Sequence, residues 1–124
     1  MRSRPTTLTG QELEIMKVVW DLESATVRDV YETLLKRRKI AYTTVMTMMK
    51  ILEEKKYLKK SQEERAYLYT PAQPKQQVLR GMVREFLDRV FNGAAEPLLV
   101  HLVEDQRLSK KDVEELARTI RRKP

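Results

Sequence analysis

The 124-residue chain has no cysteine, a single histidine and three widely separated glycines. The absence of cysteine excludes disulfides, thiolate metal sites and a thiol redox switch. One histidine offers no second imidazole for a metal site or a catalytic pair, and Gly10, Gly81 and Gly93 lie too far apart to form one phosphate-binding loop. We therefore expect no metal, no cofactor and no enzymatic activity.

Long apolar runs are also missing. The N-terminal residues 1–5 are not followed by an apolar segment, and no stretch has the length and composition of a membrane-spanning helix. These absences predict a cytoplasmic protein with no secretory signal and no membrane insertion.

Positive charge, by contrast, is abundant and concentrated. The formal net charge of the chain is +7. Residues 36–60 contain nine lysines and arginines and two glutamates, so nine minus two gives this stretch an excess of +7 and the remaining residues balance. Most charge runs are solvated surface. Beside a polar helix face, however, such a stretch is typical of a phosphate-binding footprint.

That polar face belongs to a helix predicted over residues 42–56. Apolar residues recur there at i, i+3, i+4 and i+7, which places them on one stripe: Val45, Met48, Met49 and Leu52. The opposite stripe consists of Thr43, Thr47, Lys50 and Glu54. Two short strands are predicted next, over 57–61 and 66–70, with a polar turn between them. This order is typical of the recognition helix and wing of a winged helix-turn-helix domain.

Three sequence signals predict where other helices begin. A hydroxyl residue is followed three positions later by a carboxylate, the spacing of a capping box, in Thr9 with Glu12, Thr26 with Asp29 and Ser109 with Asp112. They predict helices over about 10–22 and 27–38, and a last helix after Ser109. The start of the helix at 42–56 is not determined by such a signal, because Ala41 is a poor cap and Thr43 is a better one.

Pro71 and Pro74 predict a boundary between two parts of the chain. The fold class we expect is mainly α with a small β-hairpin. Its parts are a flexible N-terminus at 1–7, a winged-helix DNA-binding domain at 8–71 and a helical dimerisation module at 72–124. In the module, Asn92-Gly93 ends one helix and Pro97 begins the next.

The second part is too small to bury its many apolar side chains alone. We therefore favour a homodimer over packing onto the first domain, since two-fold symmetry also suits paired DNA half-sites. The predicted dimerisation residues are Val78, Met82, Phe86, Phe91, Leu98, Leu102, Leu116 and Ile120.

Candidate DNA contacts fall into two groups. Short polar or apolar side chains on the helix face can meet base edges or thymine methyl groups, and the candidates are Thr43, Thr44, Met46, Thr47 and Lys50. Cations beside that face are better suited to phosphates, which position a protein without reading sequence: Lys36, Arg37, Arg38, Lys39, Lys59 and Arg65. For Tyr67 and Tyr69 we predict core packing, and the indole of Trp20 should be buried with a hydrogen-bond partner.

The order of these parts resembles the penicillinase repressor family, which comprises β-lactamase and methicillin-resistance repressors and a copper-responsive branch. The resemblance begins at Leu8 and is carried by residues 15–20, 41–55, 67–69, 91–93 and 108–116. It implies an N-terminal winged helix, a C-terminal helical dimerisation module and repression of transcription from palindromic operators.

This sequence departs from the family pattern at several positions. Many members have Arg where this chain has Ile51, and several have Gly where it has Lys56. The β-lactam-responsive members are cut at an Asn-Phe bond, which here aligns with His101-Leu102, so the resemblance leaves cleavage by a membrane sensor protease open. The copper branch uses C-terminal cysteines, and their absence excludes thiolate copper sensing.

The sequence therefore predicts a homodimeric repressor that binds a double-stranded DNA operator. Two alternatives remain open at this point. One is a protein-interaction adaptor in which the winged domain binds an acidic partner. The other is a regulator whose small-molecule effector lies between the two parts of the chain.

Overall fold

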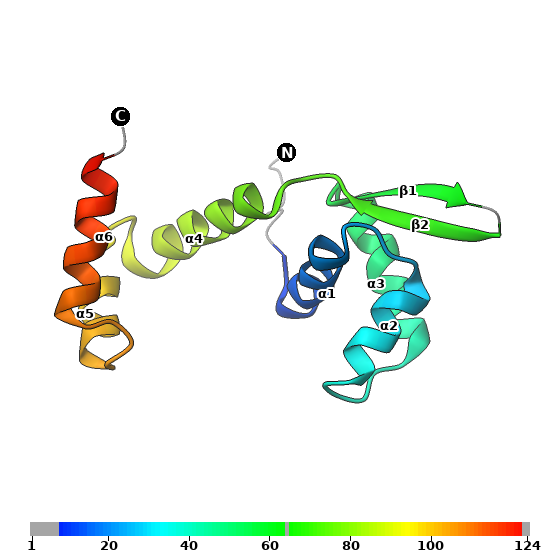
Figure 1. Cartoon of the computed structure of the whole chain (residues 1–124), viewed down its shortest axis with the longest axis horizontal. Helices are drawn as coiled ribbons and strands as arrows, with labels where there is room; N and C mark the ends of the chain where they lie inside the picture. Colours follow the sequence, from blue (N-terminus) through cyan, green and yellow to red (C-terminus); the bar gives the residue numbers. More distant parts are fainter. Residues whose placement is uncertain (1–7, 64, 123–124) are drawn as a thin grey trace. The chain divides into compact units, whose positions relative to one another are not determined.

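The computed structural model describes residues 8–63 and 65–122, without the side chains of residues 63 and 120–122. The N-terminal segment predicted to be flexible, residues 1–7, lies outside this described part. Eight elements follow in order: α1 (Gly10–Leu22), α2 (Val27–Leu35), α3 (Tyr42–Glu54), β1 (Leu58–Glu63), β2 (Ala66–Pro71), α4 (Lys75–Phe91), α5 (Glu96–Glu104) and α6 (Lys110–Arg122) (Figure 1). The predicted class, mainly helical with one antiparallel hairpin, is confirmed.

All three predicted capping boxes form. At the start of α1, Thr9 Oγ1 accepts from the Glu12 amide at 3.1 Å and Glu12 Oε1 accepts from the Thr9 amide at 2.9 Å. The same reciprocal bonds begin α2 and α6. Helix α3 has no side-chain cap at Ala41, as its sequence indicated. Local hydrogen bonding thus determines three of the helix starts.

Helix α2 ends at Leu35, before the predicted end near residue 38. The amides of Arg37 and Arg38 both donate to the Leu34 carbonyl, at 2.9 and 3.1 Å, which tightens and ends the last turn. No apolar side chain between residues 36 and 39 could extend the buried stripe. The chain turns instead, and Ile40 packs against the core just before α3 begins.

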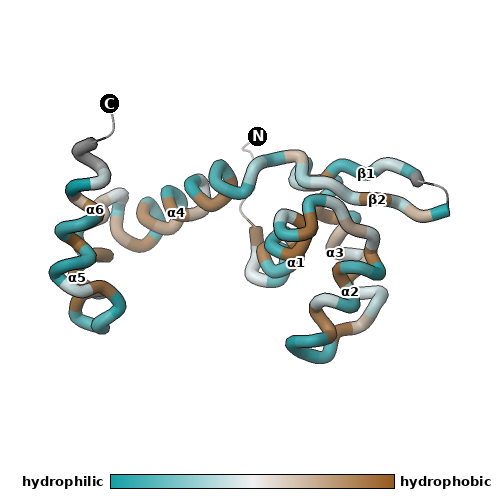
Figure 2. The backbone as a smooth tube through the Cα atoms, viewed as in Figure 1, coloured by the Kyte–Doolittle hydropathy of each residue, from teal (hydrophilic) through white to brown (hydrophobic). Residues whose placement is uncertain are grey.

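The core of the first compact unit is formed by α1, α2, α3 and the base of the hairpin. The largest fully buried side chains come from all four elements: Ile15, Met16, Val19, Val30, Leu34, Val45, Met49, Leu52 and Leu58. Apolar residues accordingly cluster along these helices (Figure 2). Ala25 and Tyr69 exchange two backbone hydrogen bonds, of 2.9 and 2.8 Å, so strand β2 is tied to the α1–α2 connection.

The segment after the hairpin is held firmly to this core. Trp20 Nε1 donates to the Gln73 carbonyl at 3.0 Å, which supplies the predicted partner for the indole. Gln73 Nε2 in turn donates to the Lys56 carbonyl at 3.1 Å. Val78 is buried in the same core and Met82 packs against it. The first compact unit consequently extends to Met82, whereas the sequence suggested a boundary at residue 71.

The second compact unit starts at Val83 and contains the rest of α4 with α5 and α6. Asn92 and Gly93 adopt positive φ values of 55° and 86° and end α4, and Pro97 lies in the first turn of α5, both as predicted. None of the residues described from 83 onward is buried. In the described segments of the chain, no helix is long and apolar enough to cross a membrane.

Candidate nucleic-acid interface

Helix α3 presents a polar face to solvent on the side opposite its buried stripe. Val45, Met49 and Leu52 are fully buried. Four of the five candidate base-contact residues are exposed, namely Thr43, Met46, Thr47 and Lys50. The fifth, Thr44, is half-buried on the flank of the helix that also carries Ile51. The exposed face of α3 therefore contains four of the five residues that the sequence predicted as base contacts, and Thr44 lies at its edge.

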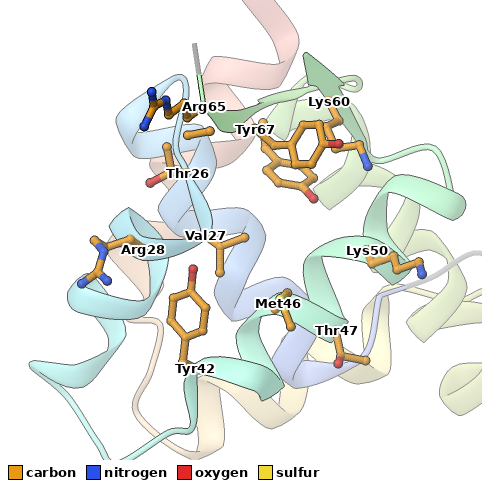
Figure 3. A pocket seen from close by; sticks show the side chains of 12 residues that line it. Thr26, Val27, Arg28, Tyr42, Met46, Thr47, Lys50, Lys60, Arg65 and Tyr67 are labelled. Carbon is orange, nitrogen blue, oxygen red and sulfur yellow. The ribbon is translucent and has the colours of Figure 1, made fainter. Parts of the chain in front are cut away.

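A groove of about 800 Å³ separates this side of α3 from the hairpin and from the start of α2. Figure 3 shows Met46, Thr47 and Lys50 on α3, with Lys60 and Tyr67 on the hairpin across from them. Arg28 and Tyr42 also line the groove, as does Arg65 near the tip of the hairpin. The walls are thus apolar or aromatic near the middle and carry cations around the rim.

The cations of the α2–α3 loop are not equivalent. Lys36, Arg37 and Lys39 are exposed. Arg38 is also exposed, but it forms an ion pair with Glu14 of α1, with 2.8 Å between Nη2 and Oε1. The hydrogen bond from Arg38 lowers the pKa of the Glu14 carboxyl, and the same bond raises the pKa of Arg38. Among the described residues, the other three loop cations form no ion pair with a carboxylate, although Arg37 lies close enough to Glu14 to lower the pKa of its carboxyl slightly further.

The hairpin has two faces with different residues. Leu58, Lys60 and Tyr69 belong to the face that turns toward the helices, while Lys59 alternates to the other face. Tyr69 is buried as predicted, and this burial raises the pKa of its phenol. The prediction that Tyr67 packs in the core is wrong, because this residue is 51% exposed. The hairpin extends beyond the helices at this point, so no core is available there.

The groove residues that the sequence analysis did not identify as DNA contacts include Arg28, Tyr42, Lys60 and Tyr67. Tyr42 packs edge-on against Tyr31, with ring centroids 5.3 Å apart. The Lys60 Nζ atom lies 4.4 Å from the centre of the Tyr67 ring. The sequence places Lys60 only within the basic stretch at 36–60. Side chains alternate along a strand, so Lys60 lies on the same face of the hairpin as Leu58 and its cross-strand partner Tyr69. This alternation is the sequence signal that could have identified Lys60 as a groove residue.

An ion pair between buried Glu12 and half-buried Lys55 joins the start of α1 to the end of α3. Lys55 Nζ lies 2.9 Å from Oε1 of Glu12, which also accepts from the Thr9 amide. Burial raises the pKa of Glu12, but the hydrogen bonds from Thr9 and Lys55 outweigh it and the net shift is downward. The pair fixes α3 against α1. Within the described residues, no cluster of acidic, histidine or cysteine side chains could hold a metal ion.

The predicted dimerisation residues fall into two places. Val78 and Met82 belong to the core of the first unit. The second unit holds five others, all exposed or half-buried: Phe86, Phe91, Leu98, Leu102 and Leu116. The side chain of Ile120 lies outside the described residues. A shallow apolar hollow of about 360 Å³ lies nearby, lined by Leu99, Val100, Val103, Glu104 and Val113. In α5, His101 is exposed beside half-buried Leu102.

Comparison with known proteins identifies related sequences across nearly the whole chain. It is 29% identical over 109 residues to a penicillinase repressor of Bacillus licheniformis, covering 88% of this chain and 85% of that protein. It is also 35% identical over 101 residues to the transcriptional regulator BlaI of Mycobacterium tuberculosis, covering 80% and 73%.

Two solved structures resemble the first unit. One is the solution structure of the DNA-binding domain of the repressor BlaI, with a TM-score of 0.53, 30% identity and coverage of 60% of this chain and 90% of that one. The other is monomeric Bacillus licheniformis BlaI in complex with the blaP half-operator, with a TM-score of 0.51, 32% identity and coverage of 61% and 92%. Residues 8–122 match the penicillinase repressor family model, and the chain belongs to that family.

Proposed function

We propose that this protein is a sequence-specific DNA-binding transcriptional repressor that acts as a homodimer on palindromic promoter operators. The observation that carries the proposal is the shared groove of α3 and the hairpin, which Thr47 and Lys50 line from one side and Lys60 and Tyr67 from the other. An exposed helix face with a flanking wing suits insertion into the major groove. A related domain of this fold has been solved in complex with a half-operator.

Within this proposal, base reading belongs to α3. Thr47 and Met46 can contact a base edge or a thymine methyl group, and Lys50 can donate to guanine. Thr43 lies on the same exposed face, whereas Thr44 can reach DNA only from its flank. Phosphate contacts come from Lys36, Arg37, Lys39, Lys59 and Arg65. The pair with Glu14 supports a different role for Arg38, which is to hold the α2–α3 loop against α1.

Homodimerisation is supported by the apolar surface of the second unit. Phe86, Leu99 and Leu116 are 38–50% exposed, and the described residues from 83 onward include no buried side chain. A surface with several exposed apolar side chains is stabilised when a second copy of the chain covers it and removes it from water. A two-fold dimer would present two copies of α3 to two inverted half-sites, with chromosomal DNA in the cytoplasm as the partner.

Relief of repression by cleavage of the His101-Leu102 bond, by a membrane sensor protease, is a further part of the proposal. The exposed position of His101 and the absence of buried residues in the described part of α5 support it, since such a helix opens easily to a protease. Mass spectrometry of the chain recovered from cells before and after induction would identify the cut. A chain that stays intact during derepression would contradict this step.

Nuclease footprinting on the DNA upstream of the gene tests the function itself. The wild-type protein should protect two inverted half-sites, and Thr47→Ala should lose that preference while it still binds DNA non-specifically, because only a base-facing hydroxyl has been removed. Uniform protection of any duplex by the wild-type protein would contradict sequence-specific repression. Equal loss of both kinds of binding in the variant would show that Thr47 does not read bases.

A further inference from the structure

One lysine connects the hairpin to the face of α3. The Lys60 Nζ atom on β1 lies 3.5 Å from Oε1 of Glu53 on α3. The same atom lies 4.4 Å from the ring centre of Tyr67 on β2, and Figure 3 shows the lysine beside that ring. Both ion-pair partners are only about one-third exposed, at 31% for Lys60 and 32% for Glu53. A single cation thus bridges three elements.

The position of this bridge along the hairpin is what gives it significance. Nearer the base, buried Leu58 fixes β1 to the helices. At the level of Lys60 itself, its ladder partner Tyr69 exchanges two backbone hydrogen bonds with Ala25. Farther out, Gln62 pairs with Tyr67 across the ladder, and both side chains are exposed. Among the described residues, the pair of Lys60 with Glu53 is the only ion pair between the hairpin and the helices.

We propose that Lys60 is a positioning residue that fixes the angle between the hairpin and α3. Before DNA binds, Lys60 would hold Arg65 and Tyr67 at a fixed position relative to Thr47 and Lys50. Binding would then not have to supply the free energy for ordering the hairpin. This inference rests on the proposed DNA-binding function. Glu53 already forms an ion pair with the Lys60 ammonium, whereas Lys50 and Lys59 form no ion pair with the described residues and are free to meet phosphates.

Glu53→Gln distinguishes this role because positioning and simple electrostatics predict opposite signs. Removal of a negative charge beside DNA should tighten binding to every duplex if Glu53 only repels phosphates. If Glu53 anchors Lys60, the variant should bind the footprinted operator about threefold to fivefold more weakly, the upper part of the range expected for losing a partly exposed ion pair. Its binding to a scrambled duplex should be unchanged or tighter.

Glu54→Gln is the matched control. It makes the same charge change at the next position of α3, where the side chain is exposed and forms no ion pair with the described residues. Its operator affinity should equal or exceed that of the wild-type protein. Operator binding that tightens equally in the Glu53 and Glu54 variants would overturn the positioning role.

Substitutions of Lys60 test the bridge from its other end. Lys60→Arg keeps the charge and the stacking on Tyr67, so it should bind the operator as the wild type does. Lys60→Gln should weaken operator binding without changing the salt dependence, and hydrogen exchange of amides in 58–71 should become faster at an unchanged unfolding midpoint. A salt slope reduced by about one would instead identify Lys60 as a phosphate contact and overturn the proposal.

These outcomes are separate from the test of the proposed function. A wild-type protein that shows no operator preference contradicts sequence-specific DNA binding itself. A wild-type protein that prefers its operator, together with a Glu53→Gln variant that keeps full preference, contradicts only the positioning role of Lys60. If Glu53→Gln lowers the unfolding midpoint, the comparison of Lys60→Gln with Lys60→Arg still decides the question.

Discussion

Lys56 lies two residues after the last residue of α3, Glu54, and its backbone is in the left-handed region with φ of 75°. The Tyr57 amide donates back to the Leu52 carbonyl at 2.9 Å, which closes the end of the helix around this conformation. A side chain with a Cβ is strained there, whereas glycine is not.

Replacing Lys56 with glycine should stabilise the fold. We expect Lys56→Gly to raise the free energy of unfolding by about 1 kcal/mol, because glycine has no Cβ to make the left-handed conformation sterically unfavourable. Chemical denaturation of the full chain measures the change. Lys56→Ala is the control, since it removes the same charge but keeps the Cβ. If both variants are equally stabilised, the charge and not the backbone conformation is responsible.

At the scale of elements, α3 is held from both ends, and each end uses a different contact. The Glu12–Lys55 ion pair fixes its C-terminal end to α1. The Arg38–Glu14 pair holds the loop that leads into its N-terminal end to the same helix. A recognition helix fixed in this way keeps its exposed side chains in one arrangement, which favours specific contacts with DNA.

The two neighbouring arginines of that loop should therefore behave differently. Arg37→Ala should weaken binding to operator and scrambled duplex alike and flatten the salt slope by about one, because an exposed phosphate contact is lost. Arg38→Ala should leave that slope unchanged, since Glu14 already neutralises its charge. Anisotropy titrations at several salt concentrations measure both slopes. Equal changes in the two variants would refute this division of roles.

Local sequence signals predicted which helices and strands form better than they predicted where the elements and the first compact unit end. The Thr9, Thr26 and Ser109 caps determine helix starts through bonds within one turn, so their spacing in the sequence was sufficient. The boundary after the hairpin depends on Gln73 bonding to Trp20, a contact across 53 positions that no local pattern contains. Strand alternation predicted a shared face for Tyr67 and Tyr69, but it could not predict where the helices beneath them end.

At the scale of the whole molecule, the two compact units differ in how they bury apolar side chains. The first has a continuous core that includes Val78 of α4. The described residues of the second, from Val83 onward, include none that is buried, although Val83, Val90 and Val100 are about half exposed. This contrast supports a division of labour in which one unit binds DNA and the other pairs with a second copy.

Leu116→Asp tests that pairing directly. Leu116 is 50% exposed, so a single chain should tolerate the aspartate, whereas an apolar dimer interface should not. Sedimentation equilibrium should show a dimeric wild type and a monomeric variant. Thr119→Asp adds the same charge at another exposed position of α6 and should remain dimeric. A Leu116→Asp protein that sediments as an intact dimer would remove this face from the interface.

Selection of binding sites from a random duplex library, with the purified full-length protein, tests the central claim most directly. We predict that the recovered sequences contain two inverted copies of one half-site at a fixed spacing of about one or two turns of DNA, because two α3 helices related by two-fold symmetry must read them together. Recovered duplexes with no common sequence would contradict the assignment of the α3–hairpin groove as an operator-reading surface.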